Sequence, residues 1–152
     1  MESKNYWSSE LYPLFLDSVS SCTYANCTDE DLQGQLDNLT LKAIARFKFP
    51  KISLKYAKDD NGYYWSEEVP TMREYLVLLG YMKMYWVEYQ LSRERIYKNS
   101  YVDKNVTAWS PAALISSIEK AYTALRADAR KVEEDYSRIN KDGKPAIGDI
   151  NV

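Results

Sequence analysis

Carboxylate side chains are the residues of this sequence best suited to acid–base or metal chemistry, and they stand in short runs. The runs occupy positions 29–31, 59–60, 67–68 and 133–135. A helix start explains the first run, a turn the second and a solvated helix face the last. The tetrapeptide Asp-Asp-Asn-Gly at 59–62 lacks the spacing and terminal glutamate of a calcium-binding loop. We therefore interpret every run as structural.

Histidine is absent from the whole sequence. The commonest general base, the usual zinc ligand and the Ser-His and Cys-His nucleophile arrangements are therefore missing. The two cysteines, Cys22 and Cys27, cannot complete a zinc site by themselves, and no glycine-rich phosphate loop occurs. We expect a protein that is not an enzyme and that binds no cofactor or metal. Because no secretory signal is visible, we also expect intracellular synthesis with both thiols reduced.

One stretch of the chain is strongly basic, because every charged residue between Asp37 and Asp59 is a lysine or an arginine. Three aromatic residues are interleaved with six cations: Lys42, Arg46, Lys48, Lys51, Lys55 and Lys58. Such a strip can contact a phosphate backbone. It also suits a helix C-terminus followed by a hairpin edge, and we favour this second interpretation. The net charge of -2 gives no overall attraction to nucleic acid or to an anionic membrane.

The elements that would position these residues are mostly helical. Residues 75–90 are apolar on almost every side of a helix, and Lys83 and Glu88 near the middle argue against a membrane span. We expect a central helix from about residue 70 to 98, covered by three other helices.

Three further segments have the period of amphipathic helices. The first is 11–22, with Pro13 in its first turn, and the second is 28–49, with Thr28 as its N-terminal cap. The last is 111–139, whose apolar stripe is Leu114, Ile118, Ala121, Leu125, Ala129, Val132 and Tyr136.

Alternating residues and a turn at 59–62 predict a β-hairpin at about 52–65. Residues 140–152 contain two glycines and a proline, which indicates an extended C-terminal arm. We expect a mainly α protein, a four-helix bundle-like subunit with one inserted β-hairpin. Residues 1–139 form its single domain and 140–152 its arm.

Several short motifs occur in a recognisable order. They are ARFKFPKISL at 45–54, GYYW at 62–65, SPAAL at 110–114 and DYSR at 135–138, with Glu74, Leu76, Leu79, Met82, Trp86 and Gln90 between them. Together they resemble the head-to-tail connector, or neck adaptor, proteins of tailed bacteriophages. The resemblance implies a non-catalytic virion subunit that forms a ring of about twelve copies below the portal and extends the DNA channel. The partners it implies are the portal protein, other neck or tail ring proteins and, non-specifically, packaged DNA, with no membrane.

Under this interpretation the aromatic and aliphatic residues that one subunit leaves uncovered contact neighbouring subunits. The expected interface residues are Ile52, Leu54, Tyr56, Tyr63, Trp65, Tyr75, Met82, Tyr85, Trp86, Tyr89, Ile147 and Ile150. The expected DNA-channel contacts are Lys51, Lys55 and Lys58. Two alternatives remain open: a small helical nucleic-acid-binding module that uses residues 42–58, and an intracellular helical adaptor that binds a peptide in an aromatic groove.

The C-terminal arm generates a prediction about assembly. Ile147, Ile150 and Val152 alternate with polar residues, but three side chains recover less free energy than the ordering of the segment costs, about 1 to 2 kcal/mol per residue. Limited proteolysis should therefore cut after Lys141 or Lys144 in the free protein and much more slowly in assembled particles. Equal cutting rates in both states would show that the arm has no part in assembly.

Overall fold

A computed structural model describes residues 4–19, 27–54, 56–101 and 111–139 of the chain. Its elements follow one another as β1 (Asn5–Tyr6), α1 (Trp7–Ser18), α2 (Asp29–Arg46), β2 (Ala57–Lys58), β3 (Tyr64–Ser66), α3 (Met72–Tyr101) and α4 (Pro111–Ser137). The described part is mainly helical and contains a small three-stranded antiparallel sheet. The expected class, a helical bundle with a hairpin insertion, is confirmed.

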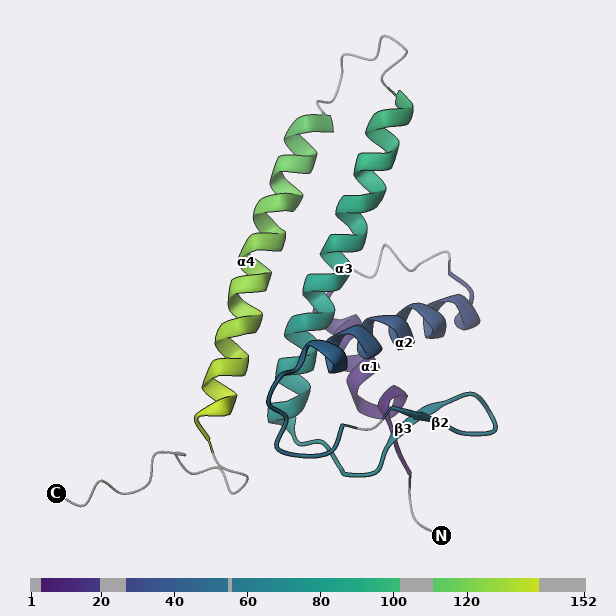
Figure 1. The fold of residues 1–152 in the computed structure, drawn as a ribbon. Coiled ribbons are helices and arrows are strands. Elements are labelled where there is room, and N and C mark those ends of the chain that lie inside the picture. The colour runs from purple at the N-terminus through teal and green to yellow at the C-terminus, as the bar shows by residue number, and fades with distance from the viewer. Residues whose placement is uncertain (1–3, 20–26, 55, 102–110, 140–152) are drawn as a thin grey trace, which may run out of the picture.

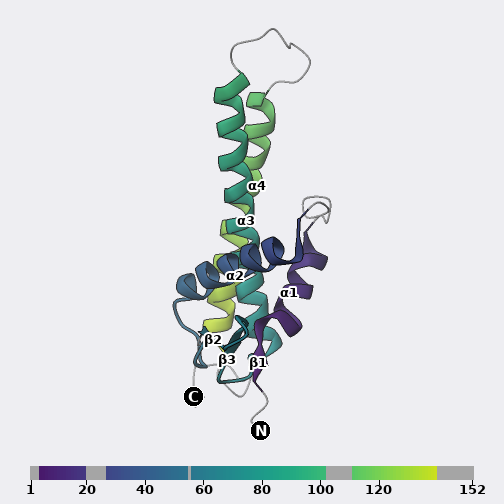
Figure 2. The ribbon, with the colours of Figure 1, turned by 90° about the vertical axis from the view of Figure 1, so that its right-hand side faces the viewer.

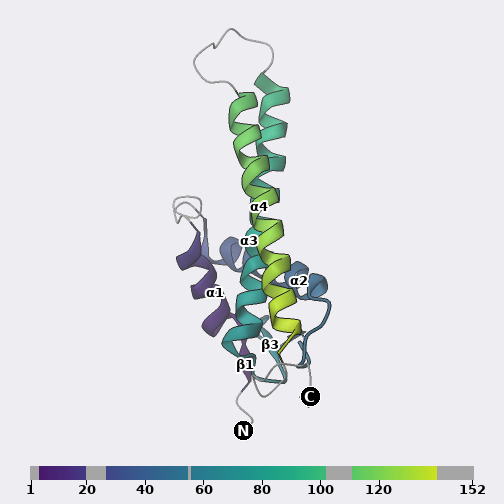
Figure 3. The same ribbon diagram turned by 90° about the vertical axis from the view of Figure 1, so that its left-hand side faces the viewer.

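Helices α3 and α4 form a long antiparallel pair, and the other elements gather around one half of it (Figure 1). Helix α2 crosses α3 at a steep angle, and α1 lies beside both helices (Figure 2). The opposite view shows α4 running alongside α3 on the side away from α1 (Figure 3). The strands lie at the end of the pair where α3 begins and α4 ends (Figure 1). Towards the other end, α3 and α4 extend beyond α1 and α2.

Helix α3 is the centre of the packing, which explains why its sequence is apolar on almost every side. Val77, Leu78 and Met82 are fully buried, and α3 contacts α1, α2 and α4. Helix α3 approaches α4 closely at Gly80, where an added Cβ would lie 3.3 Å from both Cα and Cβ of Ala129. Two small residues therefore allow the long helices to meet.

Helix α1 begins earlier than the sequence predicted. It starts at Trp7 rather than near residue 11, so Pro13 lies inside the helix and not in its first turn. Trp7, Leu11 and Phe15 recur every four residues and are all buried. The burial of these large side chains outweighs the backbone hydrogen bond that Pro13 cannot make.

Helix α2 begins as predicted and ends earlier than predicted. The Thr28 hydroxyl accepts a hydrogen bond from the Asp31 N–H at 3.2 Å, which is the expected cap. The helix stops at Arg46 instead of reaching residue 49. Phe47 has an extended backbone, with φ of -65° and ψ of 105°, and the Lys48 N–H that follows donates to the Glu133 carboxylate at 2.6 Å.

The predicted hairpin is confirmed, although its first strand is shorter than expected. Strand β3 pairs with β2 on one side and with β1, near the N-terminus, on the other. At the turn, Asp59 accepts hydrogen bonds from the N–H groups of Asn61 and Tyr63, and Gly62 has a φ of 87°. Ile52 and Leu54 precede β2 and are not part of the sheet.

Helix α4 begins at Pro111, as predicted, but its apolar stripe is only partly buried. Ala129 and Tyr136 are covered, whereas Leu114 is 45% exposed and Val132 37%. Leu114 is in the first turn of α4, and this end of the helix extends beyond α1 and α2 (Figure 1). The predicted arm, 140–152, lies outside the described residues.

The Gly80–Ala129 contact predicts opposite outcomes at two helical glycines. Gly34→Ala should raise the free energy of unfolding by about 0.5 to 1 kcal/mol, because alanine favours a helix and nothing lies within 4 Å of its Cβ. Gly80→Leu should lower it by about 1 to 3 kcal/mol, because the added atoms meet Ala129. Urea denaturation followed by circular dichroism measures both changes. A fully stable Gly80→Leu protein would contradict this close helix packing.

Candidate functional site

An aromatic groove lies between α2 and α3, with a volume of about 440 Å³. Its lining residues are Gln35, Asn38, Leu39, Lys42, Tyr85, Trp86 and Tyr89. The four residues from α2 follow the spacing of one helix face, and those from α3 occupy little more than one turn. Two crossing helices therefore build the groove from side chains that each presents on a single face.

Two buried hydrogen-bond donors lie at or next to this groove. The indole N–H of Trp86 and the side-chain nitrogen of Gln90, one turn further along α3, have no partner within the described residues. A buried donor without a partner is costly, and the indole N–H of Trp7 in the core is another donor of this kind. The ammonium group of Lys42 lies 5.7 Å from the centre of the Tyr85 ring. The groove thus combines aromatic surface with unpaired donors and one cation.

The residues predicted for the central-helix interface divide into two groups. Tyr85, Trp86 and Tyr89 line the groove, and Tyr89 is 52% exposed. Tyr75 and Met82 lie in the core of the chain and do not reach its surface. Tyr75 packs edge-on against Trp7 with ring centres 6.4 Å apart, and burial, the largest cause, together with nearby Glu10 raises the pKa of Tyr75 to about 12.

Two of the predicted hairpin residues are engaged within their own chain. Leu54 and Tyr56 pack against the core, and the Tyr56 hydroxyl donates to the Asp37 carbonyl at 2.6 Å. Tyr56 also stacks on Tyr64 with ring centres 3.9 Å apart. The remaining hairpin residues, Ile52, Tyr63 and Trp65, are partly or largely exposed. Ile147 and Ile150 lie outside the described residues.

The cations of the basic strip have different neighbours in the folded chain. Lys51 donates to the Tyr136 carbonyl at 2.7 Å and lies over the Tyr136 ring, while Lys58 lies 5.3 Å from the centre of the Tyr64 ring. Lys55 is outside the described residues. Of the other cations, Lys42 lines the aromatic groove and Arg46 and Lys48 line a separate pocket beside α4. The cations of the strip therefore contact different parts of the chain.

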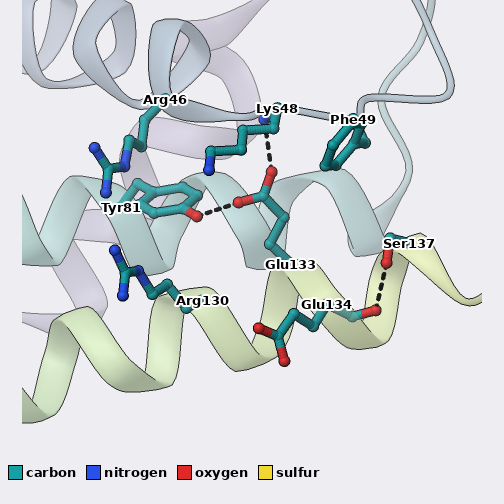
Figure 4. A pocket seen from close by; sticks show the side chains of 8 residues that line it. All are labelled: Arg46, Lys48, Phe49, Tyr81, Arg130, Glu133, Glu134 and Ser137. Atoms are coloured by element: carbon teal, nitrogen blue, oxygen red, sulfur yellow. Dashed lines mark hydrogen bonds between the residues drawn. The ribbon is translucent and has the colours of Figure 1, made fainter.

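A buried carboxylate at Glu133 corrects the prediction that 133–135 is a solvated helix face. Glu133 is 6% exposed and accepts hydrogen bonds from the Lys48 N–H and from the Tyr81 hydroxyl (Figure 4). Burial, the largest cause, and this hydrogen bond raise the pKa of Tyr81. Sequence reasoning missed this role, although Ala129, Glu133 and Tyr136 share the spacing of one helix face.

A second buried carboxylate, Glu74, lies at the start of α3. It accepts hydrogen bonds from the N–H and hydroxyl of Thr71, the capping-box arrangement, and from the Tyr136 hydroxyl at 2.8 Å. Burial alone would raise the pKa of Glu74, but these hydrogen bonds outweigh it and lower the pKa. The Tyr136 hydroxyl also accepts from the Lys51 N–H at 2.9 Å. Glu74 and Glu133 thus join α3, α4 and the segment after α2.

No family model matches this sequence, and no curated protein or solved structure is significantly similar to it. Among the described residues, no group of three or more cysteine, aspartate or glutamate side chains is placed to hold a metal ion. No helix in the described part of the chain has the length and apolar character needed to cross a bilayer.

The hydrogen bonds of Glu133 predict a difference between two neighbouring residues. Glu133→Ala should lower the free energy of unfolding by about 1 to 3 kcal/mol, because the Lys48 N–H and the Tyr81 hydroxyl lose their acceptor. Glu134→Ala is the matched control, because Glu134 is exposed, and it should change stability by less than about 0.5 kcal/mol. Chemical denaturation measures both values. Equal effects would show that burial of Glu133 contributes nothing specific.

Proposed function

We propose that this chain is a structural subunit that assembles with copies of itself into a ring, of the kind that joins head to tail in tailed bacteriophages. The order of the four sequence motifs and the mainly helical fold with a small hairpin both support this proposal. The observation that carries it is the aromatic groove between α2 and α3, with half-exposed Tyr89 and the unpaired indole N–H of Trp86.

Ring formation requires two different surfaces on each subunit, because a closed cyclic ring larger than a dimer is built from head-to-tail contacts. The groove is one surface. A candidate for the other is an apolar patch at the start of α3, where Val69, Met72 and Leu76 are 67%, 56% and 51% exposed. Met72 and Leu76 are one helical turn apart and lie on one face. Such a patch, inserted into the groove of a neighbour, would bury apolar area on both subunits.

Tyrosine and tryptophan suit this role, because they bury large areas and their polar atoms accept or donate at an interface. A carbonyl of the neighbouring subunit would pair with the Trp86 indole N–H and remove the cost of that buried donor. In the proposed assembly the ring extends the DNA channel, contacts the portal protein and the next ring of the neck, and catalyses no reaction. Its location would be the neck of the virion.

A peptide-binding adaptor is a second candidate, and the dimensions of the same groove favour it. A cavity of about 440 Å³ lined by aromatic residues can hold side chains of an extended or helical peptide. The two candidates differ in the oligomeric state of the purified chain. A ring subunit self-associates through the groove, whereas an adaptor is a monomer with the groove open.

Self-association through the groove can be tested with one charge substitution. Tyr89→Glu should raise the concentration needed for assembly by about tenfold or more, because a carboxylate replaces an aromatic contact. Leu41→Glu is the matched control: Leu41 is 48% exposed on α2 but does not line the groove. Sedimentation velocity and mass photometry measure assembly, and electron microscopy shows whether the assemblies are rings.

Both substituted side chains are about half exposed, so both variants should fold, and circular dichroism checks this. A wild-type chain that stays monomeric at every concentration would overturn the proposal and favour the adaptor. Assembly that Leu41→Glu disrupts and Tyr89→Glu does not would move the interface away from the groove.

A further inference from the structure

Three cationic side chains meet at a pocket between the end of α2 and the last turns of α4. The pocket has a volume of about 280 Å³ and is lined by Arg46, Lys48, Phe49, Tyr81, Arg130, Glu133, Glu134 and Ser137. Figure 4 shows the guanidinium groups of Arg46 and Arg130 on opposite sides of the Tyr81 ring, with the Lys48 side chain extending towards the same ring. Arg46 and Arg130, which are 84 positions apart in the sequence, therefore line one site.

The carboxylates of the pocket do not neutralise these cations by direct pairing. Both oxygens of Glu133 already accept hydrogen bonds, from the Lys48 backbone and from Tyr81. In Figure 4 no hydrogen bond joins the Glu134 carboxylate to either guanidinium group. Within the described residues, no ion pair joins Arg46, Lys48 or Arg130 to an acidic side chain. Arg46 also interacts with the Tyr81 hydroxyl, and the remaining donors of the three side chains are open to a ligand.

Helix dipoles do not account for the whole cluster. Arg46 lies in the last turn of α2, where a cation is favoured by the negative helix end. Arg130 lies about two turns before the end of α4, which is beyond the reach of that effect. Arg130 is exposed, and it lines the pocket opposite Arg46. The convergence of the two arginines needs another explanation.

We propose that this pocket binds a phosphate group, either free or in the backbone of a nucleic acid. A guanidinium group can donate two parallel hydrogen bonds to an oxyanion. Two arginines and one lysine together have more N–H donors than the two oxygens of one carboxylate can accept. Because two carboxylates share the pocket with three cations, the binding is weak and depends strongly on salt. This site is independent of ring formation, so either proposal can fail without the other.

The test measures binding of two phosphate sources to the full chain. Sodium pyrophosphate is compared with sodium chloride at equal ionic strength by the shift of the thermal unfolding midpoint, and a fluorescent DNA duplex is followed by anisotropy at low salt. The double variant Arg46→Gln/Arg130→Gln should weaken binding by about tenfold or more, because both guanidinium groups are lost. The matched control, Lys120→Gln/Arg126→Gln, removes the same charge from exposed positions of α4 outside the pocket and should bind nearly as the wild type does.

A further variant, Arg130→Lys, keeps the charge and the exposed position but loses the planar fork, and it should bind less tightly than the wild type. It keeps the test decisive if the double variant does not fold. Binding of pyrophosphate alone assigns the site to free phosphates, binding of the duplex alone assigns it to nucleic acid, and binding of both assigns it to the phosphate group itself. No binding of either probe by the wild type, or equal losses in the pocket and control variants, would overturn the proposal.

Discussion

The buried carboxylate of Glu133 joins three parts of the chain by hydrogen bonds. It ties α4 to α3 through the Tyr81 hydroxyl and to the end of α2 through the Lys48 N–H. A carboxylate removed from water is unfavourable unless hydrogen bonds replace its hydration, and here each oxygen has a donor. Helix α2 ends at Arg46, and after Lys48 the chain turns towards Tyr136, whose hydroxyl accepts a hydrogen bond from the Lys51 N–H.

Helix α3 illustrates how one apolar helix organises a small domain. Gly80 and Ala129 allow α4 to approach closely on one side, while α1 and α2 cover other sides. Around Tyr85, Trp86 and Tyr89 the cover is incomplete, and the aromatic groove remains. Unpaired donors at Trp86 and Gln90 show that this surface is not fully satisfied by the chain itself. These features of the groove are the structural basis of the proposal that a partner binds there.

In the folded chain, the cations of the basic strip have different environments. In the sequence its six cations form one stretch, but in space Lys42 lies at the groove, Lys51 is bonded to Tyr136 and Lys58 lies over Tyr64. Arg46 and Lys48 instead join Arg130 from α4 at a pocket. Electrostatic attraction to a phosphate depends on such clustering in space, because the field of separated cations is screened within about 10 Å at moderate salt.

The sequence by itself determined the local features of this protein. The Thr28 cap, the turn at 59–62 and the start of α4 at Pro111 depend on bonds or backbone preferences within a few residues. The helical class followed from periodicity, because burial of one face imposes its spacing on the sequence. The three aromatic residues of the central helix, Tyr85, Trp86 and Tyr89, could likewise be singled out from the sequence. The single apolar stripe of an ordinary surface helix does not account for all of them.

Only the tertiary structure decided the features that depend on distant partners. Glu133 and Lys48 are 85 positions apart, and no local pattern shows that the Glu133 carboxylate will accept a hydrogen bond from the Lys48 N–H. The same reason applies to β1, which pairs with Ser66 and Trp65 across about sixty residues, and to Trp7, whose burial extends α1 through Pro13. The sequence analysis assigned Tyr75 and Met82 to a subunit interface, but both side chains pack in the core of the chain. Residue type fixes what a side chain can do, but its burial is set by the elements that the fold places around it.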